Sequence, residues 1–239
     1  MAKLKWDQAG SKFYETGVSN GVLYVKTDGQ YGPGVAWNGL ISVSENPSGG
    51  EPQALYADNI KYLNLLSNEE FGASIEAYTY PDEFAACDGS VALGEGETPG
   101  GVLIGQQPRK EFALVYKTLL GNDAKGNDFG YRLHVIYGAL AAPSQKQYQT
   151  VNDSPEAITF SWDLTTTPVP VKGHKPTASL TIDSVKVGSS NMKKIEDALF
   201  GADPEVASVV GEDGLIVASE EEGPRLLMPD EIIAMAAGE

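Results

Sequence analysis

The chain has 239 residues, a formal net charge of −16 and one cysteine, Cys87. A chain of this length buries roughly 70% of its unfolded surface, so it needs no disulfide or metal to support a core. The lone thiol excludes an intrachain disulfide and a cysteine zinc cluster, and no run reaches the ~18 apolar residues of a membrane span. We therefore expect a reducing, intracellular setting, without export or membrane insertion.

The negative charge is concentrated at the C-terminal end. From Glu196 onward there are 12 acidic residues and one basic residue, whereas the first 195 residues hold 21 acidic and 16 basic residues. This predicts a body, residues 1–200, with an N-terminal arm over about 1–20, and an acidic C-terminal arm, residues 201–239. No basic stripe is present that would hold phosphates, so tight binding of nucleic acid is not expected.

The composition favours a mainly β fold. Helical periodicity is scarce, while 27 glycines and 14 prolines separate short β-prone segments, a pattern typical of antiparallel sheets. After an extended arm over Lys3–Tyr14, strands are predicted at Val22–Lys26 and Val35–Ser44, with a bulge at Gly39 in the second. The predicted architecture is an antiparallel β-sandwich or barrel with one flanking α-helix.

A long hairpin is predicted to project from this body. The segment Asn46–Pro52 is rich in Gly and Pro and too polar to pack, so it must be an exposed loop. Beyond it, Gln53–Ala57 and Ile60–Leu66 are predicted strands on either side of Asp58-Asn59.

The flanking helix is expected directly after the next strand. In Phe71–Tyr80 apolar residues alternate with polar ones, which indicates a half-buried strand. Pro81 then suits the first turn of a helix, with Phe84 and Cys87 on one face and Gly89 at its end.

The remaining elements follow from the same patterns. A glycine-rich stretch after Gly89 lacks the GK[ST] of a phosphate loop and is expected to be a surface loop before a strand at Val102–Gly105. Glu111–Leu120 and Gly130–Gly138 predict a hairpin whose second strand places His134 opposite an apolar row. Three more strands and one helix are then expected, namely Gln147–Val151, Ala157–Thr166, Thr177–Val187 and the helix Asn191–Phe200, with one possible helical turn after Pro229.

No catalytic, cofactor or metal site is predicted. The chain holds two histidines, His134 and His174, and no HExxH, GxSxG or CxxC motif. Two carboxylates such as Asp58 and Glu76 suit glycoside hydrolysis in principle, but their spacing does not test this.

A carbohydrate-binding module is the alternative that the aromatic residues leave open. Such a module stacks exposed rings on sugars, although aromatic residues in strands more often belong to a core or an interface. The candidates are Trp6, Trp37, Tyr78, Tyr80 and Trp162.

Several long strings resemble the major tail tube proteins of siphophages that infect Gram-positive bacteria. They include YADNIKYLNLLSNEEFGASIEAYTYPDEFAACDG, NDSPEAITFSWDLTTTPVPV and MKKIEDALFGADP, with PDEIIAM near the end. The resemblance implies a non-enzymatic virion protein of the phage tail, assembled in the host cytoplasm. It further implies homohexameric rings stacked along a tape-measure protein, contacts with tail terminator and distal tail proteins, and passage of DNA through the lumen without specific binding.

Stacking of such rings needs protrusions that become ordered on contact. The projecting loop, its hairpin tip and the acidic arm are the candidates for contacts between subunits. The residues predicted to make them are Asn46, Pro47, Gly49, Gly50, Glu51, Asp58, Asn59, Glu220, Glu221 and Glu222.

Overall fold

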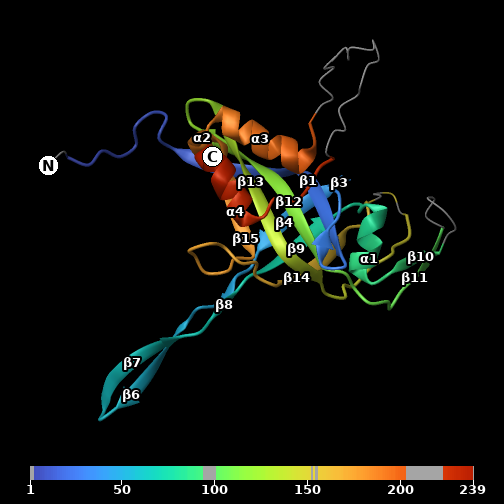
Figure 1. Cartoon of the computed structure of the whole chain (residues 1–239), viewed down its shortest axis with the longest axis horizontal. Coiled ribbons are helices and arrows are strands. Elements are labelled where there is room, and N and C mark those ends of the chain that lie inside the picture. The colour runs from blue at the N-terminus through green and yellow to red at the C-terminus, as the bar shows by residue number, and fades with distance from the viewer. Residues whose placement is uncertain (1–2, 94–100, 152, 154–155, 203–222, 239) are drawn as a thin grey trace, which may run out of the picture.

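The structure is a computed structural model that describes residues 3–93, 101–151, 153, 156–202 and 223–238. It is mainly β, as the sequence predicts (Figure 1). The strands are β1 (Phe13–Thr27), β2 (Gln30–Tyr31), β3 (Val35–Trp37), β4 (Leu40–Glu45), β5 (Ser48–Gly49), β6 (Pro52–Ala57), β7 (Ile60–Leu66), β8 (Glu69–Glu70), β9 (Gly72–Ala77), β10 (Val91–Leu93), β11 (Val102–Ile104), β12 (Phe112–Asn122), β13 (Gly126–Ala141), β14 (Phe160–Thr166) and β15 (Ser179–Asp183). The helices are the 3-10 helix η1 (Asp82–Phe84) and the α-helices α1 (Ala85–Asp88), α2 (Ser184–Val187), α3 (Ser189–Phe200) and α4 (Pro229–Ala237).

Three long antiparallel strands, β1, β12 and β13, form the centre of the sheet. The predicted hairpin is confirmed as β12 and β13, but β13 begins at Gly126, so the turn is shorter than expected. The Asn122 side chain closes this turn by accepting a hydrogen bond of 2.6 Å from the Lys125 amide. The sheet continues in the order β2-β1-β12-β13-β14-β9-β4, with β3 paired to β1 and β15 paired to β13. Among the described strands this path stays open and forms no closed barrel.

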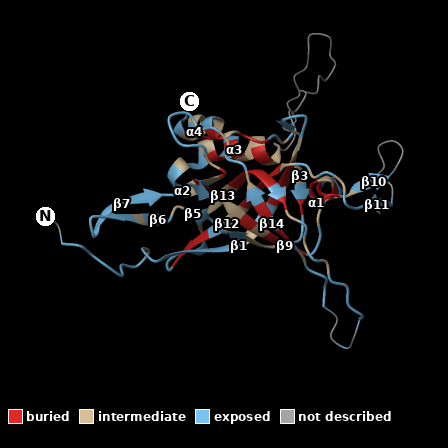
Figure 2. Cartoon of the chain, turned by 90° about the horizontal axis from the view of Figure 1, so that it is seen from below, coloured by how far each residue is buried: buried red, intermediate tan, exposed pale blue. Residues whose placement is uncertain are grey.

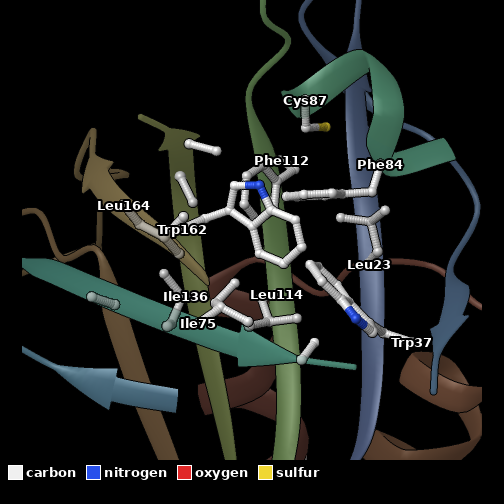
Figure 3. Close-up of a cluster of buried hydrophobic side chains, with 14 of the residues drawn as sticks. Leu23, Trp37, Ile75, Phe84, Cys87, Phe112, Leu114, Ile136, Trp162 and Leu164 are labelled. Atoms are coloured by element: carbon white, nitrogen blue, oxygen red, sulfur yellow. The ribbon is translucent and has the colours of Figure 1, made fainter. Parts of the chain in front are cut away.

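One face of the central strands packs against β9, β14 and the short helix α1. Figure 3 shows this cluster, in which the rings of Phe84 and Trp162 lie 4.9 Å apart and Trp37 packs beside them. Phe84 and Cys87 are both fully buried, which confirms the helix predicted after Pro81.

A partly buried carboxylate fixes α1 to the sheet. Asp88 accepts hydrogen bonds from Trp162 Nε1 at 2.9 Å and from Lys146 Nζ at 2.6 Å. A buried indole N–H needs an acceptor, so Asp88 satisfies Trp162 while Lys146 balances the charge of Asp88.

The opposite face of the same strands is covered by α3 and α4. Met192, Ile195 and Leu199 of α3 are buried, as predicted, against residues such as Val135 of β13. The central strands are therefore buried on both faces over part of their length, whereas most of the first half of β1 is exposed (Figure 2).

The C-terminal end differs from the sequence expectation. We expected residues 202–239 to order only against something else, but the described residues 223–238 pack on the body of the same chain. Leu227 is fully buried, its carbonyl accepts a 2.9 Å hydrogen bond from the Tyr137 hydroxyl, and Ile232 of α4 is buried beside it. Helix α3 covers only part of this face of the sheet, and residues of the C-terminal segment join the same buried cluster. The boundary at residue 200 stays a prediction.

Three strand predictions need correction. The predicted strand Gln147–Val151 is irregular, since its residues are exposed and pair with no described strand. The predicted strand Thr177–Val187 ends at Asp183, whose side chain accepts the Val185 and Lys186 amides and so starts α2. The predicted strand Val35–Ser44 is divided at Gly39, which has a φ of 81°, because β3 pairs with β1 whereas β4 pairs with β9.

Candidate assembly surfaces

Residues 46–70 form a projecting arm. Its root is the β5–β8 pair and its length is the β6–β7 hairpin, which extends away from the body (Figure 1). The register of β6 and β7 runs from Pro52 opposite Leu66 to Ala57 opposite Ile60. The predicted projecting hairpin is thus confirmed.

The tip of the arm is a tight two-residue turn. Asp58 and Asn59 both have positive φ values, 50° and 63°. A two-residue hairpin turn of type I′ requires this left-handed conformation at both positions, and Asp and Asn tolerate it better than other non-glycine residues. The turn therefore sets the register of the whole hairpin.

The arm exposes many apolar side chains. A two-stranded hairpin is at best marginally stable alone in water, and a contiguous exposed apolar patch marks an interaction surface. Every residue from 51 to 70 is exposed except Ala54, which is half-buried. The exposed apolar and aromatic residues of the arm are Leu55, Tyr56, Ile60, Tyr62, Leu63, Leu65 and Leu66.

Most of the residues predicted for subunit contacts lie on this arm. The structure places Asn46, Pro47, Gly49, Gly50 and Glu51 at the root of the arm and Asp58 and Asn59 at its tip. Glu220, Glu221 and Glu222 lie outside the described residues. Asn46 fixes the root, since its backbone N–H donates a hydrogen bond of 2.7 Å to the Gly72 carbonyl. A Cβ on Gly49, whose φ is 79°, would collide with the Asn68 carbonyl, so the root requires glycine there. Their role between subunits stays a prediction.

Sequence reasoning missed a groove at the root of the arm. This root groove has a volume of about 810 Å³. Leu66 and Glu69 line it from the arm, and Pro168, Lys175 and Pro176 line it from the body. The groove joins residues about 100 positions apart, so no local pattern indicates it.

The strand predicted at Val102–Gly105 is confirmed as β11, but its partner β10, and so a second exposed hairpin, was missed. Strands β10 and β11 pair in the register Val91 opposite Ile104 and Leu93 opposite Val102, and all their residues are exposed. The hairpin lies beyond α1, at the opposite end of the molecule from the arm (Figures 1 and 2).

A polar network joins β1, β12, β13 and β15 on the surface of the sheet. Glu15 accepts hydrogen bonds from Arg132 Nη1 at 2.5 Å and from the Thr118 hydroxyl at 2.5 Å, and it lies 3.1 Å from His134 Nε2. Arg132 also contacts Asp183 at 3.4 Å. Desolvation raises the pKa of Glu15, but the hydrogen bonds outweigh it and hold the pKa below its usual value of 4.5.

We expect Glu15→Gln to lower the free energy of unfolding by about 1 kcal/mol at pH 7. A carboxylate with a depressed folded-state pKa stabilises the fold above its unfolded pKa, and this contribution disappears as the pH falls through the folded value. The difference between wild type and variant should therefore shrink below about pH 4.5. Urea denaturation from pH 7 to pH 3 measures it. Glu51→Gln, on the exposed arm, should have no effect at pH 7, and a difference independent of pH would contradict the assignment.

The described residues do not assemble a recognisable metal centre. Those residues include no group of three or more His, Cys, Asp or Glu side chains placed to hold a metal ion. Burial raises the pKa of the Cys87 thiol to about 12, so it is not a ready nucleophile. Asp58 lies at the tip of the arm and Glu76 lies in β9, so the carboxylate pair considered for glycoside hydrolysis is not brought together (Figure 1).

The aromatic residues considered for sugar stacking are largely structural. Trp37 and Trp162 are buried in the core, and Tyr80 packs its ring edge against Trp162 at 5.5 Å. Trp6 and Tyr78 are exposed, but they do not form a shared platform with the buried rings. A carbohydrate-binding surface built on Trp37 or Trp162 is therefore excluded by their burial.

A comparison with solved structures gives a low similarity to a tube-forming assembly. No protein-family model and no curated protein matches the chain. A solved chain from an extracellular contractile injection system, in a PVC sheath–tube complex in its extended state, is 10% identical with a TM-score of 0.31. The match covers 69% of this chain and 89% of that one. This similarity is too low to assign a shared fold or function. Among the described helices, none has the length and apolar character needed to cross a bilayer.

Proposed function

We propose that this chain is a structural subunit that assembles with copies of itself into a phage-tail-like tube. The observation that supports this most directly is the arm, which holds seven large apolar or aromatic side chains in solvent. An isolated chain gains nothing from such a surface, whereas a polymer buries it at each contact. The resemblance of the long sequence strings to siphophage tail tube proteins supports the same proposal.

The finer features of the proposal come from that resemblance. They are hexameric rings, stacking along a tape-measure protein, ends closed by tail terminator and distal tail proteins, and a lumen through which DNA passes. The first 195 residues, with 21 acidic and 16 basic residues, carry a net charge of −5, and a negative wall suits such a lumen because like charges keep phosphates off it over a Debye length of about 8 Å.

Electron microscopy of the purified chain tests the proposal. Concentrated protein is expected to form rings or hollow filaments in negative stain, and light scattering should show a mass that rises with concentration. A chain that stays monomeric at every concentration up to the millimolar range, with or without added tape-measure protein, would overturn it.

A further inference from the structure

The tip of the arm and the root groove have complementary surfaces. The tip combines exposed apolar side chains such as Tyr56 and Ile60 with one acid, Asp58, and one base, Lys61. The root groove is lined by Leu66, Pro168 and Pro176, with one base and one acid. Each surface thus offers apolar area and one charge of each sign.

Among the described residues, these four charged groups have no ion-pair partner. Asp58, Lys61, Glu69 and Lys175 form no ion pair with another described residue. Lys175 lies in an exposed loop of the body and is the basic residue among those that line the groove. Opposite charges across an interface set its orientation and exclude wrong registers.

The arm cannot reach its own root. Ala57 at the tip and Ser67 in the root groove are separated by the length of β7, which is about 20 Å at a rise of about 3.3 Å per residue. A tip that enters such a groove must therefore belong to another molecule. A contact between two different surfaces is heterologous, so it propagates from copy to copy and closes a ring or continues as a filament.

We infer that the tip of the arm of one copy docks in the root groove of the next copy, with Asp58 towards Lys175 and Lys61 towards Glu69. This contact rests on the proposed function. The groove is occupied by a second copy of the chain, and the contact runs from the tip of one copy to the groove of the next. Each molecule uses its tip once and its groove once, so every copy in the polymer has the same polarity.

Disulfide trapping tests the direction of the contact. The variant Ala57→Cys/Ser67→Cys should form, on mild oxidation, a ladder of covalent oligomers in non-reducing electrophoresis. Either single variant should stop at a dimer, because each copy then offers one accessible thiol, Cys87 being buried. A bond within one chain is excluded, since Cα atoms in a disulfide are at most about 7 Å apart. A double variant that gives no ladder, although the wild type polymerises, would overturn the inference.

A charge exchange tests the chemistry of the contact. Lys61→Glu and Glu69→Lys should each raise the concentration needed for assembly by about tenfold, and the double variant should restore it towards the wild-type value. The thermal melting of each dilute variant checks that the fold is intact. Losses that simply add in the double variant would overturn the pairing. A wild-type chain that never polymerises would instead refute the proposed function itself, so the two failures are distinguishable.

Discussion

Replacing Leu227 with alanine is expected to lower the free energy of unfolding by about 2–5 kcal/mol. The side chain is fully buried in the cluster that α3 and α4 close over β13. Truncation removes its apolar contacts and leaves a cavity that the packed sheet cannot fill. Urea denaturation followed by tryptophan fluorescence measures the loss, and the buried Trp162 provides the signal.

The matched control for this variant is Ile233→Ala. Ile233 lies in α4, six residues after Leu227, but about half of its surface is exposed, 48%, so a loss below about 1 kcal/mol is expected. Equal and small losses for both variants would show that residues 223–238 do not belong to the core. Removal of residues 202–239 is expected to uncover the cluster that α3 and α4 form over β13 and so to destabilise the fold.

Removing the arm is expected to abolish assembly and leave the fold intact. In the variant, residues 51–67 are replaced by Asn-Gly, so that the root pair β5–β8 is retained. Residues 51–67 contribute nothing to either core cluster, and the melting temperature should stay within a few degrees of the wild-type value. Negative-stain microscopy and light scattering should then show no filaments at concentrations where the wild type forms them.

A point variant separates the chemistry of the arm from its length. Tyr56→Ser/Tyr62→Ser keeps the hairpin but removes two exposed rings from it, and it should weaken assembly strongly. Tyr148→Ser, which removes an equally exposed ring from the body, is the control and should assemble normally. Filaments formed by the armless chain at wild-type concentrations would contradict the role of the arm.

Local patterns determined much of this fold. The alternation in Phe71–Tyr80 predicts the buried face of β9, and Pro81 followed by Phe84 and Cys87 predicts the helix that closes the first cluster. The pair Asp58-Asn59 predicts the turn of the arm, because few residues other than glycine adopt the left-handed conformation there. These signals work because each depends on neighbouring residues alone.

The tertiary structure decided the features that depend on distant residues. The C-terminal segment is strongly acidic, so its sequence suggests a solvated arm, but Leu227 and Ile232 pack on the sheet and become part of the core. The root groove likewise exists because residues near 67 and near 175 meet where the arm leaves the body. Burial is set by what a segment packs against, and that partner lies too far along the chain for periodicity or turn chemistry to indicate it.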